Sequence, residues 1–329
     1  MKPKQARTRN RGFVIVVVLG MLILMTALLV GFSNNARVEL RRADYLLKSA
    51  QALHCATAGL NAAIAAVRDC NEFYGDTEPG RLFSGTCEIA VQAGRCSVTI
   101  VDESGKLNLN YLLKQNDKPD PVHVNRFLRL IDLLNRDNAG GPRISYSIVP
   151  AVIDWIDRND EVTALPFVKW ANLGAESAYY NAQQPPYPCK NAPLDTVDEL
   201  LLVKDVTSET FRRIQPYITV YGDGRVNLNA AADIVLESLS ENVDKALAQV
   251  IINRRNLRPF ESIAELRDLP GMTDDIYNVI KQTATVEASR HYFQVICRGY
   301  VDDVSCEVTA IVAKDLENKT VDVILYKER

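Results

Sequence analysis

The sequence has few histidines, little net charge and no recognisable catalytic motif. Its 329 residues include only three histidines, which lie far apart in the chain, so no histidine-rich metal cluster is present. The formal net charge of -3 argues against a general nucleic-acid-binding protein. We find no nucleophile–base–acid set, no phosphate-binding loop and no zinc-ligand spacing. We therefore expect a protein that is not an enzyme.

Cysteines are present in an odd number, and the rest of the composition is ordinary. Seven cysteines leave at least one thiol unpaired even in an oxidising compartment. The length allows one large domain or two smaller ones with real cores. With 47% hydrophobic residues, the chain is unlike a disordered, collagen-like or coiled-coil protein.

Charge is unevenly distributed along the chain. Residues 1–12 contain five basic side chains and no acidic one, a local charge of +5. Taking that +5 from the net -3 leaves -8 on the remaining residues. A basic start before an acidic body suggests a chain that occupies two environments.

Residues 13–32 form a long uncharged apolar run. A helix of this length spans roughly 30 Å, which is the thickness of the hydrocarbon core of a bilayer. The preceding basic residues should stay in the cytoplasm, so the body faces outward. The alternative is a cleaved secretory signal. Against it, the apolar run is unusually long, and no small-x-small cleavage site precedes Ser33.

The helical pattern continues beyond the apolar run. Between residues 33 and 68, apolar side chains such as Leu40, Leu47 and Leu60 recur mostly at steps of three, four and seven. We expect one near-continuous helix over residues 13–68. Gly59 and the Asn34-Asn35 pair are the places where it would bend.

This N-terminal pattern resembles the type IV pilin and pseudopilin family. The matching features are a basic leader ending in Arg11-Gly12, then Phe13, the apolar run and the amphipathic extension. The resemblance implies that a prepilin peptidase cuts between Gly12 and Phe13 and methylates the new N-terminus. A membrane anchor unrelated to pilins is the alternative.

Position 17 departs from that family. Most members have Glu at the fifth mature position, where this chain has Val17. In the family, that carboxylate is thought to pair with the N-terminal amine of a neighbouring subunit, which offsets its cost in the hydrocarbon core. A chain without the Glu suits a subunit at the tip of the filament, which has no neighbour ahead of it.

The body shows strand patterns at both of its ends. Residues 86–101 predict a hairpin that turns at Ala93-Gly94. Residues 292–325 predict three strands, with turns near Asp302-Asp303 and Glu317-Asn318. A long helical stretch separates the two groups. We therefore predict an α+β fold, in which a helical domain is inserted between the strands of one antiparallel sheet.

The predicted insertion contains an internal duplication. GKLNLN at 105–110 recurs as GRVNLN at 224–229, and residues 192–220 match residues 258–286. Each copy resembles a helical hairpin with a capping box, Thr196 with Glu199 and Ser262 with Glu265. We divide the chain as follows: leader 1–12; N-terminal helix 13–70, with 13–32 transmembrane; first sheet part 71–104; inserted domain 105–286, with repeats 105–222 and 223–286; C-terminal strands 287–329.

The segment LPGM at 269–272 resembles a helix-hairpin-helix turn, whose backbone N–H groups can bind DNA phosphate. Asp268, Asp274 and Asp275 surround it and would repel phosphate, and the first copy lacks the glycine. A structural turn is therefore favoured, and nucleic acid is not an expected partner.

An acidic cluster lies in the first repeat. Asp154, Asp157, Asn159, Asp160 and Glu161 fall within eight residues, and Glu176 follows in a later loop. Hard oxygen ligands at short spacing suit Ca²⁺, although the spacing is not that of an EF-hand. The alternative is a solvated acidic helix end.

The resemblance extends over nearly the whole chain. DESGKLNLN at 102–110, DWIDRND at 154–160, PPYPCKNAPLDTVDELLLVKDVT at 185–207 and VNLNAA at 226–231 resemble the minor pseudopilin K family of bacterial type II secretion systems. The absent Glu at the fifth mature position is also typical of that family. The resemblance implies a pseudopilin fold with a large inserted α-domain that binds calcium. It makes Asp157, Asp160 and Glu176 the best ligand candidates, with Asp154 and Glu161 weaker.

Two cysteines are candidates for a disulfide. Cys297 and Cys306 lie symmetrically about the Val301-Asp302 turn, so we expect them to face each other across a hairpin. The alternative is that they are small buried apolar residues of the strands.

Together these features predict a structural subunit that caps or initiates the pseudopilus. The resemblance implies minor pseudopilins I and J as partners in a tip complex. It also implies the major pseudopilin, the inner-membrane assembly platform and the prepilin peptidase as partners. We expect a single-pass protein of the bacterial inner membrane with a periplasmic body. The rival interpretations are a minor pilin of a type IV pilus and a membrane-anchored DNA-uptake protein.

Overall fold

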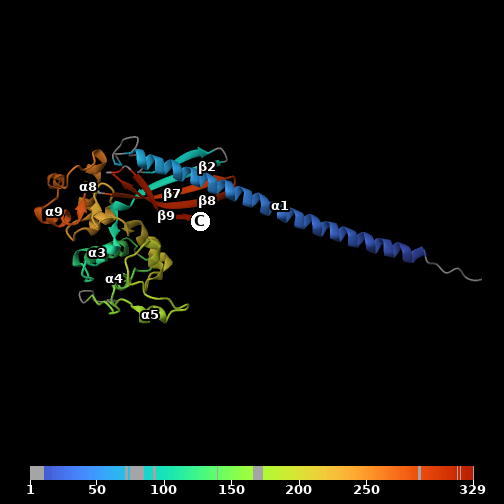
Figure 1. Cartoon of the computed structure of the whole chain (residues 1–329), viewed down its shortest axis with the longest axis horizontal. Helices are drawn as coiled ribbons and strands as arrows, with labels where there is room; N and C mark the ends of the chain where they lie inside the picture. The colour runs from blue at the N-terminus through green and yellow to red at the C-terminus, as the bar shows by residue number, and fades with distance from the viewer. Residues whose placement is uncertain are drawn as a thin grey trace, which may run out of the picture.

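One helix dominates the outline of the molecule. In this computed structural model, α1 (Arg11–Asp69) is unbroken and projects far from the body (Figure 1). The structure describes residues 11–70, 73–74, 85–91, 94–138, 140–165, 173–287, 290–316, 318 and 320–328. The predictions for residues 1–10 of the leader, for Ala93 and for Glu317 lie outside these described residues.

The N-terminal part of α1 is exposed and apolar. It is the helix of the described chain that is long and apolar enough to cross a membrane. Neither the Asn34-Asn35 pair nor Gly59 interrupts it. Gly59 instead allows close packing, because a Cβ at that position would lie 2.3 Å from Cys96 Sγ.

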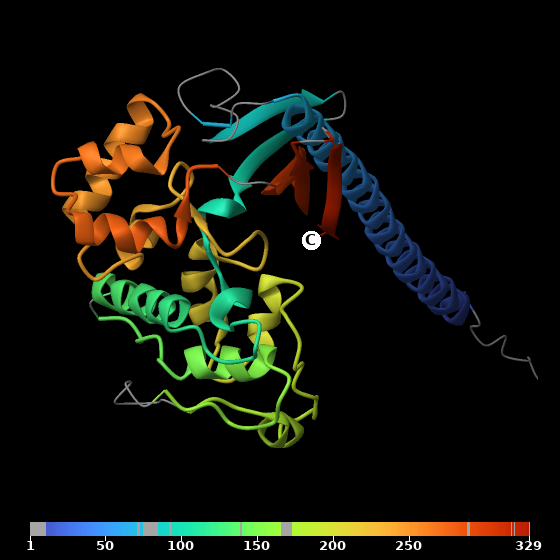
Figure 2. The same cartoon turned by 60° about the vertical axis from the view of Figure 1, so that its left-hand side comes forward.

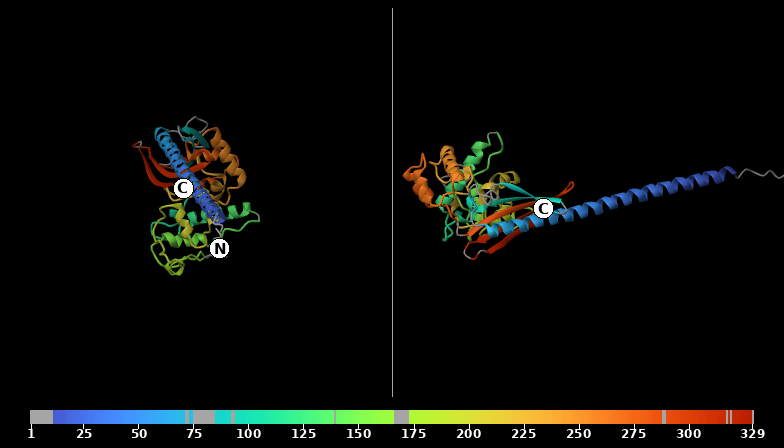
Figure 3. Two further views of the ribbon diagram at one scale, coloured as in Figure 1. Left: turned by 90° about the vertical axis from the view of Figure 1, so that its right-hand side faces the viewer. Right: turned by 90° about the horizontal axis from the view of Figure 1, so that it is seen from above.

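The second half of α1 lies on an antiparallel sheet (Figure 3). The described strands form the order β1-β2-β7-β8-β9, and each neighbouring pair is antiparallel. The strands are β1 (Thr86–Val91), β2 (Gly94–Asp102), β7 (Arg290–Val301), β8 (Val304–Asp315) and β9 (Thr320–Glu328).

A hydrophobic core fills the space between helix and sheet. Leu60 and Val67 of α1 pack with alternate residues of the strands, including Val98, Val295 and Val308. The approach is closest at Gly299, where a Cβ would lie 2.0 Å from the Ala52 carbonyl oxygen. The period-2 pattern of the strands therefore places one face of the sheet under α1.

Two lysines fix α1 relative to the sheet. The buried Lys314 of β8 donates from Nζ to the carbonyl oxygens of Val67 (2.9 Å) and Arg68 (3.1 Å) and to that of Cys70, where the last carbonyls of the helix need donors. Lys48 lies where α1 leaves the body. Its Nζ is 3.2 Å from Asp302 and 3.9 Å from Asp303, at the tip of the β7–β8 hairpin.

A helical domain is inserted between β2 and β7, and it forms two lobes beside the sheet (Figure 2). The short helix η1 (Glu103–Gly105) joins β2 to this domain. The first repeat then contains β3 (Leu107–Asn108), η2 (Leu109–Leu112), α3 (Pro121–Asp137), α4 (Ile148–Ile156), α5 (Ser177–Asn181), η3 (Val197–Leu202), α6 (Ser208–Ile214), η4 (Gln215–Tyr217) and β4 (Ile218–Thr219). The second contains β5 (Val226–Asn227), α7 (Asp233–Ser238), α8 (Lys245–Leu257), η5 (Ile263–Asp268), α9 (Asp274–Lys281) and β6 (Ala284–Thr285). The predicted α+β arrangement, a long helix on an antiparallel sheet with an inserted helical domain, is confirmed.

The duplicated Asn-Leu-Asn motifs have the same structural role. β3 pairs in parallel with β4, and β5 pairs in parallel with β6. Asn110 Nδ2 donates to the carbonyl oxygens of Leu194 and Val220, and Asn229 Nδ2 donates to those of Phe260 and Val286. Each asparagine thereby fastens the start of its repeat to the end.

The hairpins of the two repeats differ from the prediction in one respect. Their first helices, η3 and η5, are 3₁₀ rather than α. The predicted capping interaction is present in both copies, because Glu199 and Glu265 accept from the backbone N–H of Thr196 and Ser262 at 3.0 Å. In the following turns, Gly271 and Asp205 both adopt positive φ, 85° and 64°. The aspartate of the first copy therefore occupies the conformation that glycine adopts in LPGM.

The expectation that Cys297 and Cys306 face each other directly across the hairpin is wrong. The β7–β8 hairpin turns at Asp302-Asp303, so Cys297 faces Val308, and Cys306 faces Gly299. The two cysteines are therefore diagonal neighbours, which lie roughly 7–8 Å apart with their Cβ atoms somewhat closer.

Candidate metal centre

Three buried carboxylates converge in the first repeat. Asp154, Asp157 and Glu176 each offer one oxygen, and these oxygens all lie within 4.8 Å of one another. Asp154 lies in α4, Asp157 ends that helix, and Glu176 directly precedes α5 (Figure 1). All three side chains are at most 3% exposed.

The sequence of α4 explains why Asp154 is buried. The helix is apolar on every side, and each of its residues from Ile148 to Ile156 is buried. Asp154 Oδ1 accepts from the backbone N–H of Thr163 at 2.9 Å. No residue in the described chain donates to its Oδ2.

Asp157 and Asn159 shape the turn that follows α4. The Asp157 N–H donates to the Ile153 carbonyl oxygen at 2.9 Å and closes the helix. Asp157 Oδ1 accepts from the N–H of Asn159 at 3.1 Å. Asn191 Nδ2 donates to the Asn159 carbonyl oxygen at 2.9 Å, which holds this turn against the later loop.

Gly174 allows that later segment to approach Asp154. A Cβ at Gly174 would lie 2.1 Å from Asp154 Oδ2 and 2.7 Å from the Pro150 carbonyl oxygen. Its N–H donates to the Thr163 carbonyl oxygen at 2.9 Å. Only a residue without a side chain therefore fits between α4 and Glu176.

Burial and mutual repulsion raise the pKa values of the three carboxyl groups. Burial, followed by the charges of Asp154, Asp157 and Asp160, raises the pKa of Glu176 to about 8. Burial raises the pKa of Asp154 to about 6 despite its hydrogen bonds to Thr163, and it also raises the pKa of Asp157. Without a cation, concentrated negative charge is therefore costly at this site.

The structure brings some of the predicted calcium ligands together and leaves the others outside the group. Asp157 and Glu176 belong to the converging group, and so does Asp154, which was expected to be weaker. Asp160 lies beside the group, where its Oδ1 accepts from the N–H of Ser177 at 3.2 Å. Glu161 is exposed, and its own N–H donates to Asn159 Oδ1 at 2.7 Å.

Cys189 is a neighbour that the sequence did not single out. Its Sγ donates to the Asp154 carbonyl oxygen at 3.6 Å, and its charge interactions include Glu176. Burial raises the pKa of the thiol to about 12, so the neutral form is strongly favoured. The one sequence feature that could have pointed to Cys189 was its position in a proline-rich loop that follows Glu176.

The donor set fits a hard divalent cation. Both oxygens of Glu176 and Oδ2 of Asp154 are buried without a hydrogen-bond partner in the described chain. Buried polar atoms normally have partners, and a cation bound between Asp154, Asp157 and Glu176 would supply one to an oxygen of each. Carboxylate oxygens are the ligands that Ca²⁺ prefers.

Comparison with known proteins identifies the family. Two family models, both described as Type II secretion system (T2SS), protein K, match residues 105–223 and 226–287. These matches together cover more than half of the chain. The chain belongs to the type II secretion system protein K family. It is a minor pseudopilin, and the DNA-uptake and type IV pilin interpretations are not favoured.

Similar proteins of this family span the chain. Type II secretion system protein K of Aeromonas hydrophila is 23% identical over 95% of this chain and 96% of its own length. The protein of the same name from Klebsiella pneumoniae is 26% identical. That match covers 67% of this chain and 66% of the length of the Klebsiella protein.

A solved structure shows the same fold. It is a chain of the GspK–GspI–GspJ complex from the type 2 secretion system of enterotoxigenic Escherichia coli. The match has a TM-score of 0.65 at 19% identity, and it covers 90% of this chain and 99% of the other. The predicted pseudopilin fold is therefore confirmed.

Proposed function

We propose that this protein K family member occupies the tip of a type II secretion pseudopilus and initiates its assembly. The family match over the inserted domain carries the proposal. That domain widens the body on one side of the sheet, where it would obstruct a subunit added above it (Figure 2). Val17 at the fifth mature position removes the carboxylate that a subunit below the tip would use.

The proposed partners are the minor pseudopilins I and J. The similar solved chain belongs to a GspK–GspI–GspJ complex, which supports an equivalent tip complex for this chain. The major pseudopilin, the inner-membrane assembly platform and the prepilin peptidase complete the proposed set. Residues 13–32 would anchor the chain in the inner membrane, with the body in the periplasm.

Loss of the protein in its own bacterium tests this function. Inactivation should abolish release of folded proteins into the medium, and the intact chain should restore it. Twitching motility and pilus-dependent adhesion should remain. Normal secretion with defective twitching would instead identify a subunit of a type IV pilus.

We propose further that Asp154, Asp157 and Glu176 hold a structural Ca²⁺, with Asp160 beside them. The bound ion would neutralise the buried carboxylates and join the end of α4 to the segment before α5. Its role would be to stabilise this part of the inserted domain, because binding to the folded state alone adds to stability.

Chelation tests the calcium proposal on the full chain in detergent. Saturating Ca²⁺ should raise the melting temperature above that in EDTA by about 4 °C, because a ligand at roughly 100 times its Kd adds about 2.7 kcal/mol and the unfolding entropy of a chain of this length is about 0.7 kcal/mol/K. Asp157→Ala should remove this difference. Glu161→Ala is the matched control, because Glu161 is exposed and lies outside the converging group.

Gly174→Ala provides a second test that retains every carboxylate. The added methyl group would collide with Asp154 Oδ2 and displace it from the group. We expect the variant to lose most of its calcium-dependent rise in melting temperature. An unchanged calcium response in both Gly174→Ala and Asp157→Ala would contradict the proposed site.

A further inference from the structure

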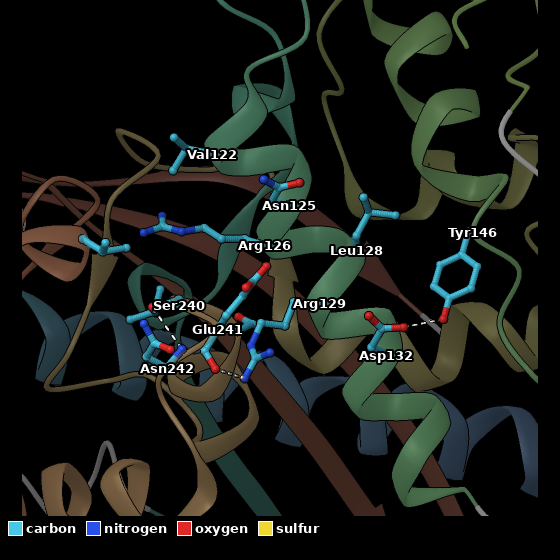
Figure 4. Close-up of a pocket in the computed structure, with 13 residues that line it drawn as sticks. Val122, Asn125, Arg126, Leu128, Arg129, Asp132, Tyr146, Ser240, Glu241 and Asn242 are labelled. Carbon is cyan, nitrogen blue, oxygen red and sulfur yellow. Dashed lines mark hydrogen bonds between the residues drawn. The ribbon is translucent and has the colours of Figure 1, made fainter. Parts of the chain in front are cut away.

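A second polar site lies between the two repeats, apart from the metal centre. It is a pocket of about 790 Å³. One wall is α3 of the first repeat, and the others are the loop after α7 and Val279 of α9, both from the second repeat. In Figure 4, Arg126 and Arg129 project from α3 toward the loop that carries Ser240, Glu241 and Asn242.

Arg126 is buried at this pocket without a hydrogen-bond acceptor. Its side chain is 3% exposed, and its Nε, Nη1 and Nη2 have no partner anywhere in the described chain. Burial lowers the pKa of the guanidinium to about 10, and the charge of Asp120 opposes that effect. The group therefore stays charged at neutral pH, with all its N–H donors unused.

The neighbouring Arg129, unlike Arg126, has hydrogen-bond acceptors for its guanidinium group. Its Nε donates to the Glu237 carbonyl oxygen at 2.7 Å, and its Nη2 donates to those of Glu241 (3.3 Å) and Val243 (3.1 Å). Arg129 thus holds the wall of the pocket in place. Of the two arginines in the lining, Arg126 is the one whose N–H donors are unused, and the side chain must turn slightly into the pocket to meet a ligand.

The rest of the lining indicates which anion fits. Asp132, which accepts from the Tyr146 hydroxyl, and the exposed Glu241 are the acidic groups of the lining. Next to these charges, one guanidinium compensates a single negative charge better than a doubly charged phosphate. Val122 and Leu239 add apolar surface for a carbon chain.

From this arrangement we infer that the pocket between the repeats binds a carboxylate group, which Arg126 receives through its planar pair of N–H donors. A carboxylate matches that geometry with two parallel hydrogen bonds. It would also supply the directly hydrogen-bonded counter-charge that the buried guanidinium lacks. Because the walls belong to different repeats, the bound carboxylate would bridge them.

Calorimetric titration of the full chain in detergent, at low salt and with calcium present, tests this inference. The probes are propionate and propionamide, which have nearly the same shape and differ in charge. We expect propionate to bind at least about tenfold more tightly, because charge-assisted hydrogen bonds are the stronger ones. This comparison depends on no variant and so on no assumption about folding.

Substitutions then assign the binding to Arg126. Arg126→Met should weaken propionate binding at least about tenfold and keep the melting temperature at or above that of the original chain, because it removes an unpaired buried charge. Arg212→Met is the matched control, since Arg212 is exposed and does not line the pocket. Glu241→Gln should strengthen binding by removing a nearby negative charge.

Three results would overturn the inference. They are equal binding of the acid and the amide, undiminished binding of propionate by folded Arg126→Met, and tighter binding of inorganic phosphate than of propionate. None of them bears on secretion or on calcium, so failure here leaves the proposed function intact.

Discussion

Asp154, Glu176 and Arg126 show at the residue scale how this domain differs from an ordinary hydrophobic core. Each is buried with at least one charged-group atom that has no hydrogen-bond partner among the described residues. Such groups cost free energy unless a ligand satisfies them. The two acids converge on one another, and the arginine lies at a separate pocket, so two ligands of opposite charge are implied.

Glu176→Gln tests the cost of the buried acids. In the metal-free protein, Glu176 has a folded pKa of about 8 against an ordinary 4.5, so the native state retains a proton that the unfolded chain releases. The contribution of this retained proton to the free energy of unfolding is fully present below pH 4.5 and is lost as the pH rises to about 8. In EDTA, the melting temperature of the original chain should therefore fall between pH 5 and 8.

The melting temperature of the variant should fall much less over this pH range. Each kcal/mol by which the two proteins differ corresponds to about 1–2 °C for a chain of this length. The variant should also lose its response to calcium. Glu161→Gln serves as the control, and it should follow the original chain. A metal-free Glu176→Gln protein that loses as much stability as the original chain would contradict this account.

Sequence reasoning found the acids but not the arginine. Asp157 and Glu176 were named through their motifs, and the structure brings them together with Asp154. Arg126 lies in a helix whose sequence permits an exposed arginine. Its burial depends on the loop after α7 in the second repeat, more than 100 residues away, and no local pattern records that contact.

At the scale of elements, the strands and the turn between β7 and β8 were predicted well, but the pairing of the two cysteines was not. The alternation over β7 and β8 identifies both strands, whereas the pairing depends on which two residues form the turn. The predicted turn near Asp302-Asp303 is present, with Asp302 at a positive φ of 50°, whereas the cysteine pairing was counted about Val301-Asp302 and so requires a shift of two residues. That shift separates Cys297 from Cys306. Pairing register follows from turn geometry more than from strand composition.

Gly299→Ala tests the packing of α1 on the sheet. A Cβ there would lie 2.0 Å from the Ala52 carbonyl oxygen of α1, so the helix and β7 must separate. We expect a loss of about 1–3 kcal/mol in the free energy of unfolding, as is usual for overpacking. Thermal unfolding of the full chain measures it. Gly85→Ala, which meets nothing within 4 Å, should have little effect.

The whole molecule combines a membrane-length helix, a sheet and a duplicated domain. Its order of elements was predictable, because the apolar run, the terminal strand patterns and the repeat each have a clear sequence signal. The convergence of α3, α7 and α9 around one pocket was not predictable from these signals. It depends on how the two repeats pack against each other.

Mass spectrometry of the protein from its own bacterium tests its maturation. We expect a chain that begins at methylated Phe13, because Gly12 ends the basic leader. Gly12→Asp should leave the leader attached and abolish secretion. A native chain that keeps Met1, or that begins beyond Phe32, would refute processing by a prepilin peptidase.

The attachment of α1 to the body makes the helix a lever arm. Lys48, held to Asp302 and Asp303, is the point at which the helix leaves the hairpin tip. The 35 residues from Phe13 to Leu47 extend about 52 Å beyond it, at about 1.5 Å per residue. A tilt of about 10° at this pivot would therefore move the far end by about 9 Å over that length. Because α1 is unbroken and its second half is packed on the sheet, any small rotation of the body would be carried to the far end of the helix as a much larger displacement.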